Sequence, residues 1–146
     1  MDLPKAEALV GRVRQDVAKR TRAALSELQS QHAAGAIVVQ DSPFDWLPGT
    51  LADVLNSRHL TNAADGMMYR EALVEAGSAL GMKVVRYPRK IDEAQMAAGQ
   101  LGIERERVVS WAREQGRRVG VPWRKEHGHA AMVAVGELGQ QTKFDI

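Results

Sequence analysis

Two stretches of this chain have the composition of buried β-strands, and a long helical segment separates them. The first, AIVV at residues 36–39, is short, apolar and mostly β-branched, and the second, KVVRY at residues 83–87, stops at Pro88. Apolar runs of this length are typical of strands in a parallel sheet that is covered on both faces. A strand, a helix and a second strand in this order form a right-handed crossover unit. The sequence therefore predicts an α/β fold with a short parallel sheet flanked by helices.

Helical periodicity covers most of the remaining chain. Apolar residues recur at spacings of three and four in each segment, and prolines and glycines stand near several of the boundaries. Thr50 with Asp53 resembles a capping box that opens a short helix. The predicted helices are residues 6–32, a short helix after Thr50, and residues 62–80, 92–101, 104–115 and 126–138. Residues 41–50 and 116–123, which are rich in proline and glycine, are predicted loops.

The length of the chain limits the number of domains. A chain of 146 residues can form one domain with a real core. We therefore expect a single α/β domain over residues 1–146, with a helical insertion at about residues 92–116. Two strands are few for a sheet, which ordinarily holds about five or six. Either a partner chain or a second copy completes the sheet, or the fold is a reduced version of a larger one.

Composition narrows the class of protein. No apolar run approaches the roughly 18 residues of a membrane span, and charges interrupt the N-terminal segment, so we expect a cytoplasmic protein with no membrane association. The absence of cysteine excludes disulfides and thiolate metal sites. Nucleotide-binding glycine motifs and the serine-hydrolase motif are absent, and the histidines, among them His59, His127 and His129, lack zinc-site spacing.

Acidic residues stand at several predicted element boundaries. Asp41 follows the first strand, Asp65 and Glu71 lie on the middle helix, and Glu126 opens the last helix near His129. Oxygen ligands that converge at the open end of a parallel sheet suit Mg²⁺ or Mn²⁺, and two such ions can hold the attacking and leaving oxygens of a phosphodiester. Each carboxylate also has an ordinary interpretation, as the cap of a turn or helix or as part of an ion pair.

Residues 93–116 have the pattern of a helix-turn-helix. An alanine-rich helix, a Leu-Gly-Ile turn and a second helix follow one another, and Arg105, Arg107 and Arg113 are positioned to reach DNA. The same pattern also fits a structural helical hairpin that buries alanine, leucine and tryptophan. A DNA reader of this kind usually has a third helix packed against the pair.

The order of the predicted elements resembles that of RuvC-like nucleases of the ribonuclease H superfamily. The matching features are the long first helix, the strand AIVV that ends near Asp41, the stretch NAADGMMYREALVEAGSALGMKVVRYP and the final PWRKEHGHAAMVAVGEL. In that family an acidic residue ends the fourth strand, and further acidic residues stand on the final helix. The resemblance covers about residues 6–138, and the family's N-terminal three-stranded meander, with its primary aspartate, has no counterpart here.

The resemblance implies a reduced ribonuclease H-like fold and a protein that processes nucleic acid, either as a metal-dependent nuclease or as an inactive relative. Asp41 and Glu126 would bind Mg²⁺ or Mn²⁺, with Asp65 or His129 assisting. The arginines that would contact nucleic acid are Arg58, Arg70, Arg86, Arg89 and Arg124. The alternative is a non-catalytic nucleic-acid-binding or adaptor protein that uses the hairpin at residues 93–116 and surface arginines.

Overall fold

The structure, a computed structural model, describes residues 2–42 and 47–144. The chain divides into two compact units, residues 1–89 and residues 90–146, and each is described by itself. The first unit contains, in chain order, α1 (Leu3–His32), β1 (Ala36–Gln40), α2 (Leu51–Leu55), α3 (Arg58–Ala79) and β2 (Lys83–Tyr87). The second unit contains α4 (Glu93–Leu101), α5 (Arg105–Val119) and α6 (Lys125–Phe144). The chain is mostly helical, and within the described residues its sheet consists of two parallel strands, in agreement with the predicted α/β class. The predicted single domain and the ribonuclease H-like arrangement stay predictions.

The two strands of the first unit pair in parallel. Ala36 pairs with Lys83 and Gln40 with Tyr87, so both strands end at the same edge of the sheet. Val39 and Tyr87 are buried there. The long α2–α3 segment makes the crossover that parallel strands require.

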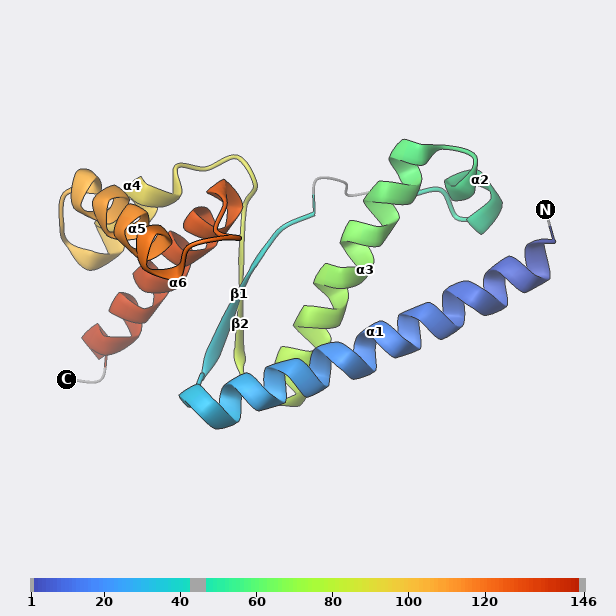
Figure 1. The fold of residues 1–146 in the computed structure, drawn as a ribbon, viewed down its shortest axis with the longest axis horizontal. Coiled ribbons are helices and arrows are strands. Elements are labelled where there is room, and N and C mark those ends of the chain that lie inside the picture. The colour runs from blue at the N-terminus through green and yellow to red at the C-terminus, as the bar shows by residue number, and fades with distance from the viewer. Residues whose placement is uncertain (1, 43–46, 145–146) are drawn as a thin grey trace. The chain divides into compact units, whose positions relative to one another are not determined.

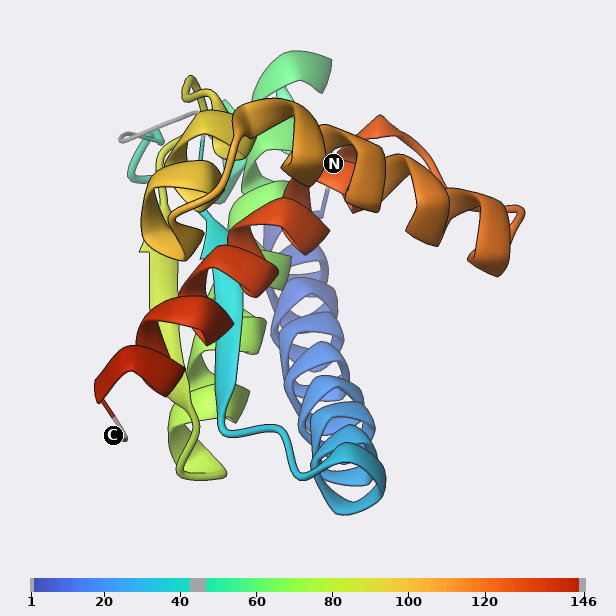
Figure 2. The ribbon, with the colours of Figure 1, turned by 90° about the vertical axis from the view of Figure 1, so that its left-hand side faces the viewer.

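Helix α3 packs directly on both strands. A Cβ atom at Gly77 of α3 would lie 3.0 Å from Ile37 Cγ2 of β1 and 3.2 Å from Val84 Cγ2 of β2, so the lack of a side chain permits this close approach. Helices α1 and α3 lie on the same side of the strand pair (Figures 1 and 2). Gln29 Nε2 of α1 donates a hydrogen bond to the carbonyl of Leu80 at the end of α3 (3.0 Å).

The helix boundaries follow from capping side chains. Thr50 Oγ1 accepts from the Asp53 N–H, which begins α2 as the sequence predicted, and the Thr50 hydroxyl also donates to the Asp53 carboxylate. Helix α3 begins at Arg58, earlier than predicted, because Ser57 Oγ accepts from the Leu60 N–H. Part of the predicted loop at residues 41–50, namely residues 43–46, lies outside the described residues.

The second unit is a bundle of three helices that pack on one another. Small side chains allow the close contact of α4 with α6, where a Cβ atom at Gly136 would lie 3.0 Å from the Cα atom of Ala97. Leu101 and Ile103 are partly buried at the edge of the core. The buried core residues are Ala94, Ala97, Ala98, Val108, Ala112 and Met132.

The prediction that residues 116–123 form a loop was wrong for the first part of that segment. Helix α5 continues to Val119 and ends at Gly120, whose φ of 73° favours glycine. Arg117 and Arg118 support this last turn, because both pair with Glu114 one turn earlier in α5. Helix α6 likewise begins at Lys125 and runs past the predicted end at residue 138.

Candidate functional site

The shared carboxyl edge of β1 and β2 positions Asp41. Its backbone N–H donates to the Tyr87 carbonyl (2.8 Å), which continues the strand pairing by one residue. Asp41 is half-buried. Arg70, which was predicted to contact nucleic acid, reaches this edge from α3, where its Nε atom donates to the Gln40 carbonyl (3.1 Å). Arg70 therefore fixes α3 to the end of β1, a role that the sequence did not indicate.

Two other predicted arginines stand at the same edge. Arg86 lies on β2 directly before Tyr87, Arg89 follows the strand, and both residues are exposed. Neither forms an ion pair within residues 2–42 and 47–144. Ligands usually approach an open parallel sheet at the carboxyl ends of its strands. In the described part of the chain, this edge has the Asp41 carboxylate and two exposed arginines. Arg58 is exposed at the start of α3.

The remaining acidic candidates of the first unit lie on α3. Asp65 is exposed and lines a pocket of about 320 Å³ whose walls also include Val10 of α1 and Val54 of α2. Glu71 is exposed as well. The structure thus assigns Asp65 to a pocket between helices, whereas Asp41 lies at the end of the sheet.

The candidates of the second unit lie near the start of α6. Glu126 and Arg124 are exposed, and the Arg124 backbone N–H donates to Nδ1 of His127 (3.0 Å). His129 is half-buried, and its Nδ1 atom lies 3.5 Å from Oε1 of the buried Glu93 on α4. Because Asp41 and Glu126 belong to different units, the predicted pairing of these two residues stays a prediction.

The side chains of the described residues do not complete a metal site. No group of three or more His, Asp or Glu side chains that could hold an ion occurs in residues 2–42 and 47–144. Among the described residues, the edge at Asp41 offers one carboxylate, whereas Mg²⁺ and Mn²⁺ bind several oxygen ligands. The described residues alone therefore do not fit a Mg²⁺ or Mn²⁺ site.

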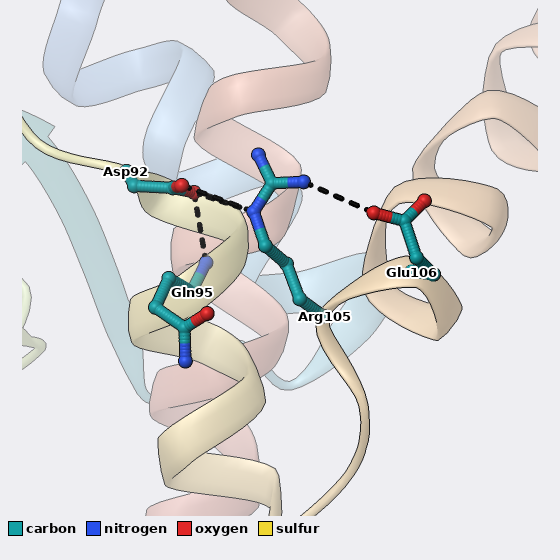
Figure 3. A network of polar contacts seen from close by, with 4 residues as sticks. All are labelled: Asp92, Gln95, Arg105 and Glu106. Atoms are coloured by element: carbon teal, nitrogen blue, oxygen red, sulfur yellow. Dashed lines mark hydrogen bonds and ion pairs between the residues drawn. The ribbon is translucent and has the colours of Figure 1, made fainter.

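The hairpin of α4 and α5 is closed by an ion pair. Asp92, the N-cap of α4, accepts from the Gln95 N–H (2.9 Å) and from Arg105 Nε (3.0 Å to Oδ2), as Figure 3 shows. On its other side Arg105 contacts Glu106 through Nη1 (3.3 Å). These contacts lower the pKa of Asp92, mainly through the Gln95 N–H and then through Arg105. Arg105, a candidate DNA contact in the sequence, is therefore already engaged within the unit.

Other arginines of α5 remain accessible. Arg107 and Arg113 are exposed, and neither forms an ion pair with another described residue. Helix α6 packs on both α4 and α5. DNA-binding helix-turn-helix domains usually have a third helix in this role.

Comparisons with family models, curated protein sequences and solved structures found no match for this chain. None of the described helices is long and apolar enough to cross a membrane.

Sequence reasoning missed two residues of the second unit. Glu93 followed the predicted cap Asp92 and gave no signal of its burial or of its contact with His129. Trp123 fell in a predicted loop, although the neighbouring GRRVGVPWRK places arginines, glycines and an aromatic ring together. Basic residues next to an aromatic ring are a combination that single-stranded nucleic-acid-binding surfaces use.

Proposed function

We propose that this protein binds and processes nucleic acid, in the manner of the RuvC-like proteins of the ribonuclease H superfamily that its sequence resembles. The observation that carries the proposal is the carboxyl edge of the parallel pair, where Asp41 follows β1 and Arg86 and Arg89 stand on and after β2. Arginine binds phosphate oxygens in a bidentate manner, so this edge suits a phosphodiester backbone. Asp41 would then lie close to the bound strand.

Two double variants test the binding. Arg86→Glu with Arg89→Glu should weaken binding of fluorescein-labelled duplex and four-way-junction DNA by on the order of tenfold or more, measured by fluorescence anisotropy, because the guanidinium groups that pair with phosphate are replaced by carboxylates that repel it. The matched control is Arg12→Glu with Arg22→Glu, which makes the same charge change at exposed positions of α1. Equal losses of affinity in both variants would mean that net charge alone causes the binding, and the proposal would fail.

Cleavage is measured separately, because the described residues do not complete a metal site. The resemblance implies that the protein cleaves DNA when Mg²⁺ or Mn²⁺ is present and that a chelator abolishes the cleavage. If the chain cleaves, Asp41→Asn should abolish cleavage and leave DNA binding intact, whereas Asp16→Asn on α1 should change neither. Cleavage that is unaffected by Asp41→Asn would remove Asp41 from the site.

The second candidate function is non-catalytic DNA binding by the second unit. The packing of α6 on both α4 and α5 favours it, because this makes the hairpin part of a three-helix unit. Arg107 and Arg113 are the residues to test, since Arg105 is engaged by Asp92. Charge reversal of Arg107 and Arg113 should abolish duplex binding if this function is correct, and unchanged affinity would exclude it.

A further inference from the structure

The second unit contains an open pocket that includes Arg113 and otherwise consists of residues that neither candidate function tests. It has a volume of about 670 Å³ and lies between the end of α5, the connection at residues 120–124 and the start of α6. Ligand pockets typically have volumes of about 300–1,000 Å³. Trp123 lines it, and the basic side chains around it are Arg113, Arg117, Arg124 and Lys125. Among the described residues, none that lines this pocket is acidic.

A glycine of α5 makes room for the tryptophan in this pocket. A Cβ atom at Gly116 of α5 would lie 2.7 Å from the indole Nε1 atom, so only glycine permits this position of the ring. Gly128 of α6 approaches the same nitrogen atom, where a Cβ would lie at 3.7 Å. His127 stacks beside the indole at a centroid distance of 6.0 Å and an interplanar angle of 29°. The ring is thus fixed between two helices while it lines the pocket.

The basic residues around the pocket are available to a ligand. Arg113, Arg124 and Lys125 are exposed and form no ion pair with any residue that the structure describes. Val121, at the rim, is 97% exposed. A fixed aromatic ring surrounded by cations is complementary to a base that stacks and to a phosphate that pairs with arginine.

We propose that the Trp123 pocket binds an unpaired nucleotide of a nucleic-acid strand. The base stacks against the indole, and Arg113, Arg124 and Lys125 contact the neighbouring phosphates. This inference rests on the proposed function, since it requires that the protein meets nucleic acid, and it adds a preference for strands with unpaired bases. A paired base cannot enter the pocket, because its ring faces are covered by its neighbours in the duplex.

The affinity for a short fluorescein-labelled oligothymidine, measured by anisotropy with the full chain, tests the inference. Trp123→Leu should weaken binding on the order of tenfold, because it removes the ring on which the base stacks, and Trp123→Phe should retain most of the affinity. The matched control is Trp111→Leu, which removes a tryptophan of α5 that does not line this pocket. An equal loss of affinity with Trp111→Leu, or no loss with Trp123→Leu, would overturn the inference.

A second variant avoids any effect of Trp123 on folding. Arg124→Gln with Lys125→Gln changes exposed side chains only, and it should reduce the slope of log affinity against log salt by about 0.7 for each phosphate that the protein no longer neutralises. An unchanged slope would overturn the inference. If duplex binding depends on Arg86 and Arg89 while both pocket variants bind like the wild type, the inference about the Trp123 pocket is wrong and the proposed function stands. If no nucleic acid binds, the proposed function fails and the pocket inference falls with it.

Discussion

Asp92 connects the starts of two helices through a single carboxylate. It caps α4 through the Gln95 N–H and also accepts from Arg105 at the start of α5 (Figure 3). Both contacts favour the ionised carboxylate, so the pKa of Asp92 lies below its ordinary value and that of Arg105 above it. The capping was predictable from the sequence. The ion pair was not, because it depends on how the turn at Gly102 brings Arg105 back toward α4.

This depressed pKa has a defined effect on stability. The folded state gains from ionised Asp92 at every pH above the ordinary aspartate pKa, and the gain is lost as the pH falls through the lower pKa of the folded protein. Asp92→Asn keeps a capping residue and removes the charge, so it should lower the melting temperature at neutral pH. The difference from wild type should vanish in acid. Circular dichroism melts over a pH series measure both effects.

The control for this measurement is Asp16→Asn, which removes an exposed ion pair with Arg20 on α1. Exposed pairs of this kind contribute little to stability, so its melting temperature should stay close to that of wild type. An Asp92→Asn difference that persists unchanged in strong acid would show that the ionised carboxylate is not the cause.

At the scale of elements, glycine has opposite roles in two helices that pack together. Gly136 of α6 lies against the backbone of Ala97 in α4, whereas Gly99 of α4 is exposed and has no atom near the position of a Cβ. The first glycine permits close packing, and the second only adds chain entropy to the unfolded state. Helical periodicity predicted both helices, but it could not distinguish these two glycines, because the difference depends on which face of each helix meets the other.

Alanine at each position should therefore change stability in opposite directions. Gly136→Ala should destabilise the protein, since the added methyl group meets backbone at 3.0 Å that cannot move aside. Gly99→Ala should stabilise it by about 0.5–1 kcal/mol. Urea unfolding followed by circular dichroism gives both free energies, and a destabilising Gly99→Ala would contradict this account of α4.

Element boundaries set the limit of what could be predicted locally. Both strands and the start of α2 were predicted within one or two residues, because β-branched runs and a capping threonine are local signals. The end of α5 was missed, because Gly116 resembled a helix terminator while it actually makes room for Trp123. The contact between Gly116 and Trp123, on either side of the turn at Gly120, is not encoded in the helical periodicity.

At the scale of the whole molecule, the first unit exposes surfaces that are suited to another chain. Helix α1 buries Leu25 but leaves Leu9, Val13 and Leu28 about half exposed. Within the described part of the chain, the outer edges of β1 and β2 pair with no further strand. Exposed apolar side chains and open strand edges are both features of association surfaces.

We therefore expect a mass in solution above the 16.0 kDa of one chain. Size-exclusion chromatography with light scattering measures it. Leu9→Glu with Val13→Glu should restore the single-chain mass, while Val121→Glu, the same kind of change in the second unit, should leave the assembly intact. A wild-type mass of one chain would contradict the expectation.

The functional candidates were only partly accessible from the sequence. Asp41 was correctly expected to follow a parallel strand, because strand and loop signals meet there. Arg70 donates from Nε to the Gln40 carbonyl, whereas Arg86 and Arg89 are exposed. The sequence could not separate these roles, because the contact depends on how α3 packs on β1. The sequence placed basic residues beside Trp123, but the close approach of Gly116 to its ring is visible only in three dimensions.

The parallel pairing of β1 and β2 has a consequence for how the chain is made. Ala36 is synthesised well before its partner Lys83. At about 5–20 residues per second, this delay lasts a few seconds. During that time the AIVVQ segment has no partner strand. The pairing with β2 also requires closing a long loop, which costs chain entropy. During synthesis this unpaired strand is therefore a place where other chains can associate, as exposed strand edges commonly are.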